Sequence, residues 1–175
     1  MNLAYLFQCA VLIFFAGTMY AGSAGETWKA LQGLVGTWEG GGSGSPGAGG
    51  GEFSFATDLQ GRVIVRKSHS EYPASEGRPA TVHDDLVIAY QEDSSRSVRA
   101  IYFDNEGHVI NYAVDASPDG KTVTFLSAPE PAAPRFRLSY VMKEPGEAAI
   151  TFEIAPPGKP DSFKIYLEGK AKRKS

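Results

Sequence analysis

Residues 135–143 read RFRLSYVMK, a stretch in which every second side chain is large and apolar. Successive side chains of a β-strand point to opposite faces of the sheet. One face of this segment therefore carries Phe136, Leu138, Tyr140 and Met142, while the other carries mostly Arg, Ser and Lys. This period of two predicts a strand with one face buried and the other in water.

The same period runs through the chain from residue 36 onward. Short turns separate the strands, as at Ser117-Pro118-Asp119-Gly120, where Pro presets φ and Gly accepts a positive φ. Strands joined by short turns pair antiparallel, and closing a long meander removes its two exposed edges. The sequence therefore predicts an all-β fold, an up-and-down antiparallel β-barrel of about ten strands, at residues 36–41, 52–59, 62–72, 83–91, 97–104, 108–115, 122–128, 135–143, 148–155 and 163–171.

Two segments depart from this period. Apolar residues recur at helical spacing between Trp28 and Val35, which predicts a short N-terminal helix capped by Thr27. Residues 40–51 are almost entirely Gly, Ser, Pro and Ala, with no side chain large enough to pack. We therefore expect a flexible loop there.

The first 24 residues differ from the rest, because they contain an apolar run from Leu3 to Phe15 and no charged side chain. This run is shorter than the roughly 20 residues that cross a bilayer and suits the apolar part of a secretory signal. We predict a signal peptide over residues 1–24, with cleavage after Ser23 or Ala24, and a single domain over residues 25–175. The mature protein would be periplasmic or secreted, and would meet a membrane only through the uncleaved signal. A retained N-terminal anchor is the alternative.

Net charge and cysteine content argue against several classes of function. The chain of 175 residues has a formal net charge of -3. Nucleic-acid binders are normally basic with a clustered positive face, so no nucleic-acid partner is expected. The one cysteine, Cys9, lies in the signal segment. The mature chain is therefore expected to have no disulfide, cysteine nucleophile or thiolate metal site.

Residues 31–40, LQGLVGTWEG, resemble the opening of the calycin barrels. Lipocalins carry Gly-x-Trp at the start of the first strand, after a short helical turn, and Gly36-Thr37-Trp38 matches this motif. The segment is more similar to an uncharacterised bacterial lipocalin-like family that opens Leu-x-x-Leu-x-Gly-x-Trp. It is distantly similar to the nitrobindin-like haem barrels, which open Gly-Thr-Trp-x-Gly-x-Gly.

This resemblance implies that Gly36 and Trp38 close one end of the barrel together with a basic side chain from the last strand. We expect Arg173 to supply it, and a cation stacked on an indole contributes about 0.5–2 kcal/mol. The nitrobindin-like proteins also imply a haem ligand, a His near the final strands. The last His here is His108, and the four predicted strands after it contain none. We therefore predict neither haem nor another cofactor.

No residue set predicts a catalytic site. His69 and His83 flank the loop at residues 73–79 and are the candidates for a metal site. Counted from the middle of this loop, His69 faces Asp84 and His83 faces Ser70, so the two imidazoles fall on opposite faces of the sheet. A His/carboxylate metal site needs three or four converging ligands. We therefore expect a surface His–Asp pair and no metal.

Barrels of about eight to ten strands commonly enclose a ligand cavity. Aromatic side chains would form its apolar wall, and tyrosine hydroxyls would orient the ligand. The sequence supports an exported lipocalin-like protein that binds a small apolar or amphipathic molecule without catalysis. The candidates for the cavity wall are Tyr90, Tyr102, Tyr112, Tyr140, Phe136 and Phe55.

Two alternatives stay open. The first is a haem- or metal-binding barrel with weak redox or isomerase activity. The second is a fully packed barrel that acts as a dimeric interaction module. It is based on the strands between residues 83 and 115, which are apolar on both faces. Their second face would be covered by the short helix or by a second copy of the chain.

Overall fold

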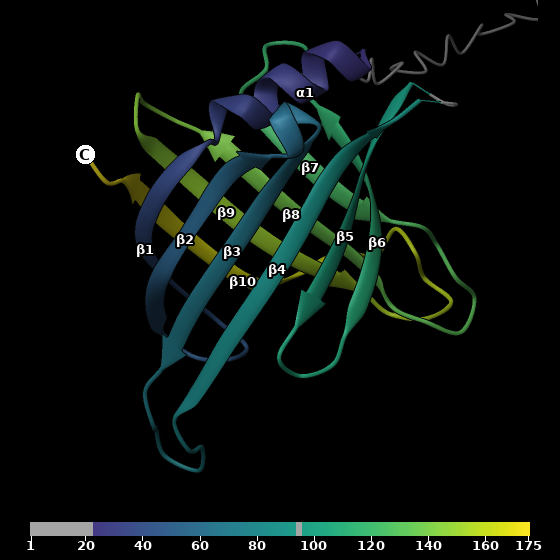
Figure 1. The fold of residues 1–175 in the computed structure, drawn as a ribbon. Helices are drawn as coiled ribbons and strands as arrows, with labels where there is room; N and C mark the ends of the chain where they lie inside the picture. Colours follow the sequence, from purple (N-terminus) through teal and green to yellow (C-terminus); the bar gives the residue numbers. More distant parts are fainter. Residues whose placement is uncertain (1–22, 94–95) are drawn as a thin grey trace, which may run out of the picture.

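The chain forms a closed barrel of ten antiparallel strands in a computed structural model that describes residues 23–93 and 96–175 (Figure 1). Each strand pairs with its neighbours in sequence, and the first strand also pairs with the last. This confirms the predicted barrel, whereas the signal segment up to residue 22 lies outside the described residues. The strands are β1 (Gly36–Gly44), β2 (Gly49–Asp58), β3 (Val63–Tyr72), β4 (Thr81–Glu92), β5 (Ser97–Asp104), β6 (Val109–Ala116), β7 (Thr122–Ser127), β8 (Arg135–Met142), β9 (Glu147–Ala155) and β10 (Lys164–Arg173).

A short helix, α1 (Ala24–Gly33), precedes the barrel. Its cap is Ser23 rather than the expected Thr27, which is buried. The Ser23 hydroxyl accepts a hydrogen bond from the Glu26 backbone N–H, and the Glu26 carboxylate accepts one from the Ser23 N–H. This reciprocal pair satisfies two backbone donors at once, which explains why the helix begins one turn earlier than predicted.

Helix α1 lies across one end of the barrel, near β5, β6 and β7 (Figure 1). Trp28, Leu31 and Leu34 belong to the same apolar cluster as the side chains inside the barrel. The helix therefore closes an end of the barrel and does not cover the outer face of β4 to β6. Within residues 23–93 and 96–175, no helix is long and apolar enough to cross a membrane.

The inner faces of the strands form a packed aromatic core at this end. The predicted inward face of β8 is correct, because Leu138 and Tyr140 are buried and Phe136 and Met142 pack against them. The Trp38 ring stacks on Phe53 at a centroid distance of 6.0 Å. The Phe55 and Phe125 rings meet Tyr140 edge-on, at 5.4 and 6.2 Å. The interior next to α1 is therefore filled.

The glycine-rich segment at residues 40–51 is not the flexible loop that we expected. It forms much of β1 and the start of β2, with Gly40 opposite Gly51 and Gly42 opposite Gly49. Gly40 and Gly42 lie on the same face as Trp38. A Cβ atom at Gly40, Gly42 or Gly51 would collide with a backbone carbonyl oxygen of the adjacent strand. The missing side chains thus allow β1 and β2 to curve sharply, as Figure 1 shows.

We expect Gly51→Ala to lower the free energy of unfolding by about 1–3 kcal/mol, the usual cost of overpacking. The new Cβ would overlap the backbone of His69 and Ser70, which cannot rotate away. Gly50→Ala is the matched control, because its Cβ would only approach the Gly40 carbonyl oxygen, at 3.3 Å. Urea denaturation followed by circular dichroism measures both. Equal midpoints for the two variants would contradict this account of the glycines.

A β-bulge interrupts β10 between Ile165 and Leu167. A regular alternation along this strand would place Ile165 and Leu167 on one face, and the bulge prevents this. Ile165 is 57% exposed, whereas Tyr166 and Leu167 both line the barrel cavity described below. An extra residue in one strand shifts the faces of the side chains that follow it, and the apolar pattern alone does not reveal where this happens.

Candidate ligand site

A cavity of about 330 Å³ opens at the end of the barrel opposite α1. One side of its wall is apolar and includes Phe136 and Phe152, whose rings stack at 6.0 Å. Tyr166 meets Phe152 edge-on, also at 6.0 Å. The apolar wall also includes Ile110, Ile154 and Leu167. We call the opposite, polar side of the opening the polar rim, formed by His83, Tyr102, Asp104, Glu106 and His108.

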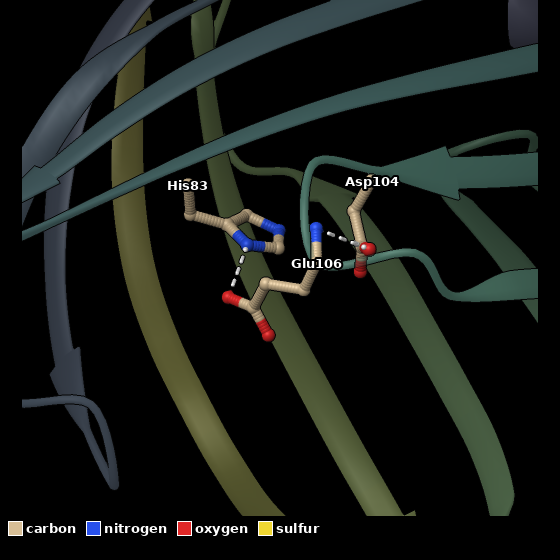
Figure 2. A group of neighbouring side chains, drawn as sticks. All are labelled: His83, Asp104 and Glu106. Carbon is tan, nitrogen blue, oxygen red and sulfur yellow. Dashed lines mark hydrogen bonds and ion pairs between the residues drawn. The ribbon is translucent and has the colours of Figure 1, made fainter.

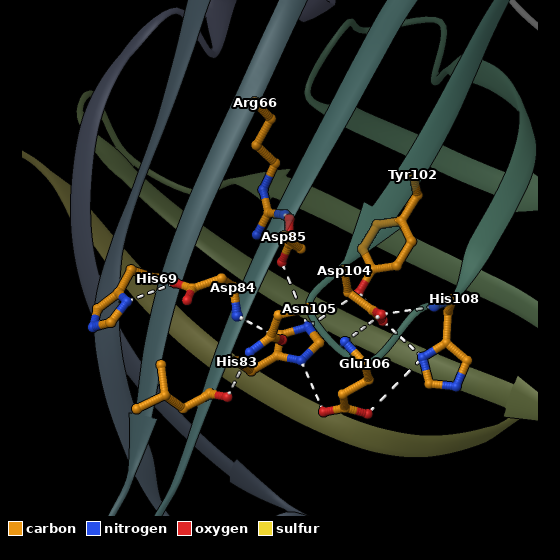
Figure 3. Close-up of polar contacts among 11 residues, drawn as sticks. Arg66, His69, His83, Asp84, Asp85, Tyr102, Asp104, Asn105, Glu106 and His108 are labelled. Carbon is orange, nitrogen blue, oxygen red and sulfur yellow. Dashed lines mark hydrogen bonds and ion pairs between the residues drawn. The ribbon is translucent and has the colours of Figure 1, made fainter.

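Hydrogen bonds connect the members of the polar rim, as Figure 3 shows. The Tyr102 hydroxyl lies 3.0 Å from His83 Nε2 and donates to Asp104 Oδ2 at 3.1 Å. Asp104 Oδ2 is also 2.8 Å from His108 Nδ1, and Asp104 Oδ1 accepts from the backbone N–H groups of Glu106 and His108. Burial opposes the ionisation of Asp104, but the hydrogen bonds from His108 and Tyr102 outweigh it and lower its pKa. The carboxylate is thus held charged at the edge of the cavity.

A buried ion pair continues this polar region into the barrel. The Arg66 guanidinium donates to the Asp85 carboxylate, and both side chains are buried. Arg66 also lies over the rings of Phe53 and Tyr140, with Cζ at 5.4 and 5.9 Å from the centroids. Burial raises the pKa of Asp85 despite the nearby guanidinium. Because Arg66 is engaged by Asp85, it does not neutralise the acidic side chains of the rim.

The six aromatic candidates for the cavity wall occupy three different places. Tyr102 and Phe136 line the cavity. Phe55, Tyr112 and Tyr140 are buried in the packed core, where burial raises the pKa of Tyr140 to about 12. Tyr90 was expected to line the cavity but lies on the outer face of β4. The reason is that His83 and Asp85 point inward, so even-numbered positions of this strand point outward.

The two candidate metal-binding histidines do not converge, as expected. The register of β3 and β4 places His69 opposite Asp84 and His83 opposite Ser70. On the outer surface, His69 Nδ1 lies 2.7 Å from Asp84 Oδ1 and His69 Nε2 lies 3.3 Å from Glu71 Oε1. These contacts, with Asp84 the larger cause, raise the pKa of His69. His83 points into the cavity and joins a different group.

That group, His83 with Asp104 and Glu106, was missed by sequence reasoning (Figure 2). Its ligand atoms, one per residue, lie within 4.8 Å of one another. The register of β4 and β5 brings it together by pairing Asp85 with Asp104. The available signal was the acidic and histidine-rich turn at residues 104–108, next to a strand carrying a second histidine. The hairpin that joins His69 and His83 does not by itself show that His83 meets this turn.

At the closed end, Arg173 packs on Trp38 in the way that the calycin resemblance implies. The Arg173 Cζ atom lies 4.4 Å from the Trp38 ring centroid. Its guanidinium donates to the carbonyl oxygens of Gly33 and Val35. A Cβ atom at Gly36 would lie 2.7 Å from Arg173 Nη1, so a glycine leaves room for this side chain. The arrangement is structural and lies at the opposite end from the cavity.

No family model and no curated protein matches the sequence. Among solved structures, the chain is similar to a de novo designed fluorescence-activating β-barrel, with a TM-score of 0.43 and 14% sequence identity. The match covers 83% of this chain and 97% of the designed one. Membership of a lipocalin-like family stays a prediction.

Proposed function

We propose that this protein is an exported, lipocalin-like binding protein for a small amphipathic molecule, without catalytic activity. The observation that carries the proposal is the open cavity of about 330 Å³ at the barrel end opposite α1. Small-molecule sites typically combine a concave, mostly apolar wall with a few placed polar groups, in volumes of roughly 300–1,000 Å³. The cavity has this composition and falls at the small end of that range.

The chemistry of the wall defines the kind of ligand. Phe136, Phe152 and the neighbouring aliphatic side chains favour an apolar body. Asp104 and Glu106 add negative charge at the rim, and the buried cation next to it, Arg66, is paired with Asp85. A ligand head that donates hydrogen bonds or carries positive charge therefore suits this opening better than a carboxylate or phosphate.

Titration with 1-aminoanthracene, a small apolar fluorophore bearing an amine, tests the cavity directly. We expect saturable binding with one site per chain. Ile110→Trp should weaken binding at least about tenfold, because Ile110 lines the cavity and the larger ring would occupy its space. Val109→Trp is the matched control. Val109 is the neighbour of Ile110 at the start of β6, and it is 60% exposed on the outer face.

Two results would contradict the cavity proposal. One is the absence of saturable fluorescence with the wild-type protein. The other is equal binding by the Ile110→Trp and Val109→Trp variants, which would place the probe elsewhere. Circular dichroism of both variants checks that the barrel is intact.

Export is the second part of the proposal, and the apolar segment near the N-terminus supports it. Cleavage after Ser23 or Ala24 would remove Ser23, which caps α1. The intact mass of the protein purified from the native exported fraction shows whether a signal is removed and at which bond. A full-length mass in the cytosolic fraction would contradict export.

A further inference from the structure

We propose that His83, Asp104 and Glu106 bind a divalent transition-metal ion of the Zn²⁺ type at the polar rim. These three side chains come from β4, the end of β5 and the turn that follows it, and Figure 2 shows them facing one another. Their ligand atoms all lie within 4.8 Å of one another. The site uses the same rim carboxylates, Asp104 and Glu106, that the proposed function assigns to the ligand head, but zinc binding can be tested without that ligand.

The residue types and their spacing suit this class of ion. Zn²⁺ is bound by imidazole nitrogens and carboxylate oxygens at about 2.0–2.2 Å. Ligands on opposite sides of such an ion are therefore at most roughly 4.4 Å apart. The ligand atoms must move slightly closer to hold an ion, and Glu106, which is 58% exposed, has room to do so. Mixed imidazole and carboxylate donors favour Zn²⁺, Co²⁺ or Ni²⁺ over Ca²⁺ or Mg²⁺, which prefer oxygen alone.

The hydrogen bonds of the rim orient the ligand atoms. Two backbone N–H groups hold Asp104 Oδ1, which fixes the carboxylate and directs Oδ2 toward the rim. The Tyr102 hydroxyl donates to Asp104, so it accepts from His83 and sets Nε2 as the protonated nitrogen. Such outer hydrogen bonds to a histidine and a carboxylate are typical of metal sites.

The contact between His83 and Glu106 can hold either a proton or a metal ion. His83 Nδ1 lies 3.3 Å from Glu106 Oε1. A proton on Nδ1 makes the contact a charged hydrogen bond, and a metal ion bound to both atoms takes the place of that proton.

A second histidine lies next to the group. His108 Nδ1 lies 2.8 Å from Asp104 Oδ2 and 3.9 Å from Glu106 Oε2. All four side chains line the cavity. An ion held by His83, Asp104 and Glu106, with His108 still hydrogen-bonded to Asp104, would face the cavity with one of four positions open to a small donor group. Structural zinc sites are closed, whereas an open position is the mark of a site that binds a further molecule.

The outer face of β3 and β4 provides a natural control. His69 also has two carboxylate neighbours, Asp84 and Glu71. Asp84 contacts Nδ1 and Glu71 contacts Nε2, so the two acids lie on opposite edges of the ring and cannot share one ion with it. The composition is the same as at the rim, but the geometry does not converge.

Zinc alone, added to the chelator-treated full chain, tests the proposal. We expect one Zn²⁺ per chain in a competition titration against a chromophoric chelator, and a visible absorption band when Co²⁺ replaces Zn²⁺. Glu106→Gln and His83→Ala should each weaken Zn²⁺ binding at least about tenfold. His69→Ala should leave the affinity unchanged.

Absence of stoichiometric Zn²⁺ binding would overturn the proposal, as would an affinity that depends on His69 and not on His83. Glu106 lies in an exposed turn, so its variant keeps the test valid even if His83→Ala fails to fold. The fluorophore titration with and without a chelator separates this site from the cavity. Absence of zinc binding by the wild-type chain together with saturable fluorophore binding would overturn the metal site alone. Zinc binding by the wild-type chain without fluorophore binding would overturn the ligand site alone.

Discussion

Arg66→Met is expected to lower the free energy of unfolding by about 3–5 kcal/mol, because it leaves the Asp85 carboxylate buried without its partner. Both side chains of the pair are buried, and Arg66 also packs over Phe53 and Tyr140. Methionine keeps much of the side-chain volume, so the effect reports the lost charge rather than a cavity. Urea denaturation monitored by circular dichroism measures it.

The double variant Arg66→Met/Asp85→Leu separates the net contribution of the ion pair to stability from the cost of leaving one buried charge unpaired. Replacing both charges with apolar side chains removes the desolvation penalty as well as the attraction, so most of the lost stability should return. Lys172→Met is the control, since it breaks an exposed pair with Glu147 at 3.0 Å and should change stability by less than about 1 kcal/mol. A similar small loss in Arg66→Met would show that Asp85 is hydrated or neutral in the folded protein.

Trp38→Ala is expected to cost about 3–5 kcal/mol, the usual range for removing a large buried aromatic side chain. The Trp38 ring is fully buried, stacks on Phe53 and lies under the Arg173 guanidinium. Its indole N–H also donates to the Leu34 carbonyl oxygen at 2.8 Å, which joins β1 to the end of α1. The substitution thus empties the closed end of the barrel and frees the helix.

Trp38→Phe serves as the comparison for this prediction. Phenylalanine keeps a ring between Phe53 and Arg173 but cannot donate to Leu34, so its loss of stability should be well below that of Trp38→Ala. Thermal unfolding followed by circular dichroism compares them without relying on tryptophan emission. A loss under about 1 kcal/mol for Trp38→Ala would mean that Trp38 does not anchor this end.

The sequence predicted the strands well wherever large apolar side chains alternate with polar ones. The strand predicted at residues 97–104 has the bounds of β5, and the predicted inward face of β8 is correct. The prediction failed at residues 40–51. Strands were predicted only where side chains are large enough to pack, so this segment was predicted to be a loop. There the strands form because side chains are absent, which permits a curvature that larger residues would block. Periodicity carries no information about curvature.

The candidate site was predicted less completely than the fold. The turn between β3 and β4 gave the register of His69 and His83, since it could be counted from one hairpin. Recognising that His83 meets Asp104 and Glu106 required the register of the next hairpin as well. The wrong face assigned to Tyr90 has the same origin, because apolar residues on both faces of β4 do not reveal which one points inward.

The pairing of β1 with β10 has a consequence for how the protein is made. Arg173 binds the carbonyl oxygen of Val35 across 138 positions of the chain. On the ribosome, β1 therefore emerges long before the strand that completes its hydrogen bonds, and one of its edges stays unpaired while the rest is translated. The ring can close only after β10 has left the exit tunnel. Nascent chains stalled before that point hold an open sheet with two free edges, the form most prone to pair with a neighbouring copy.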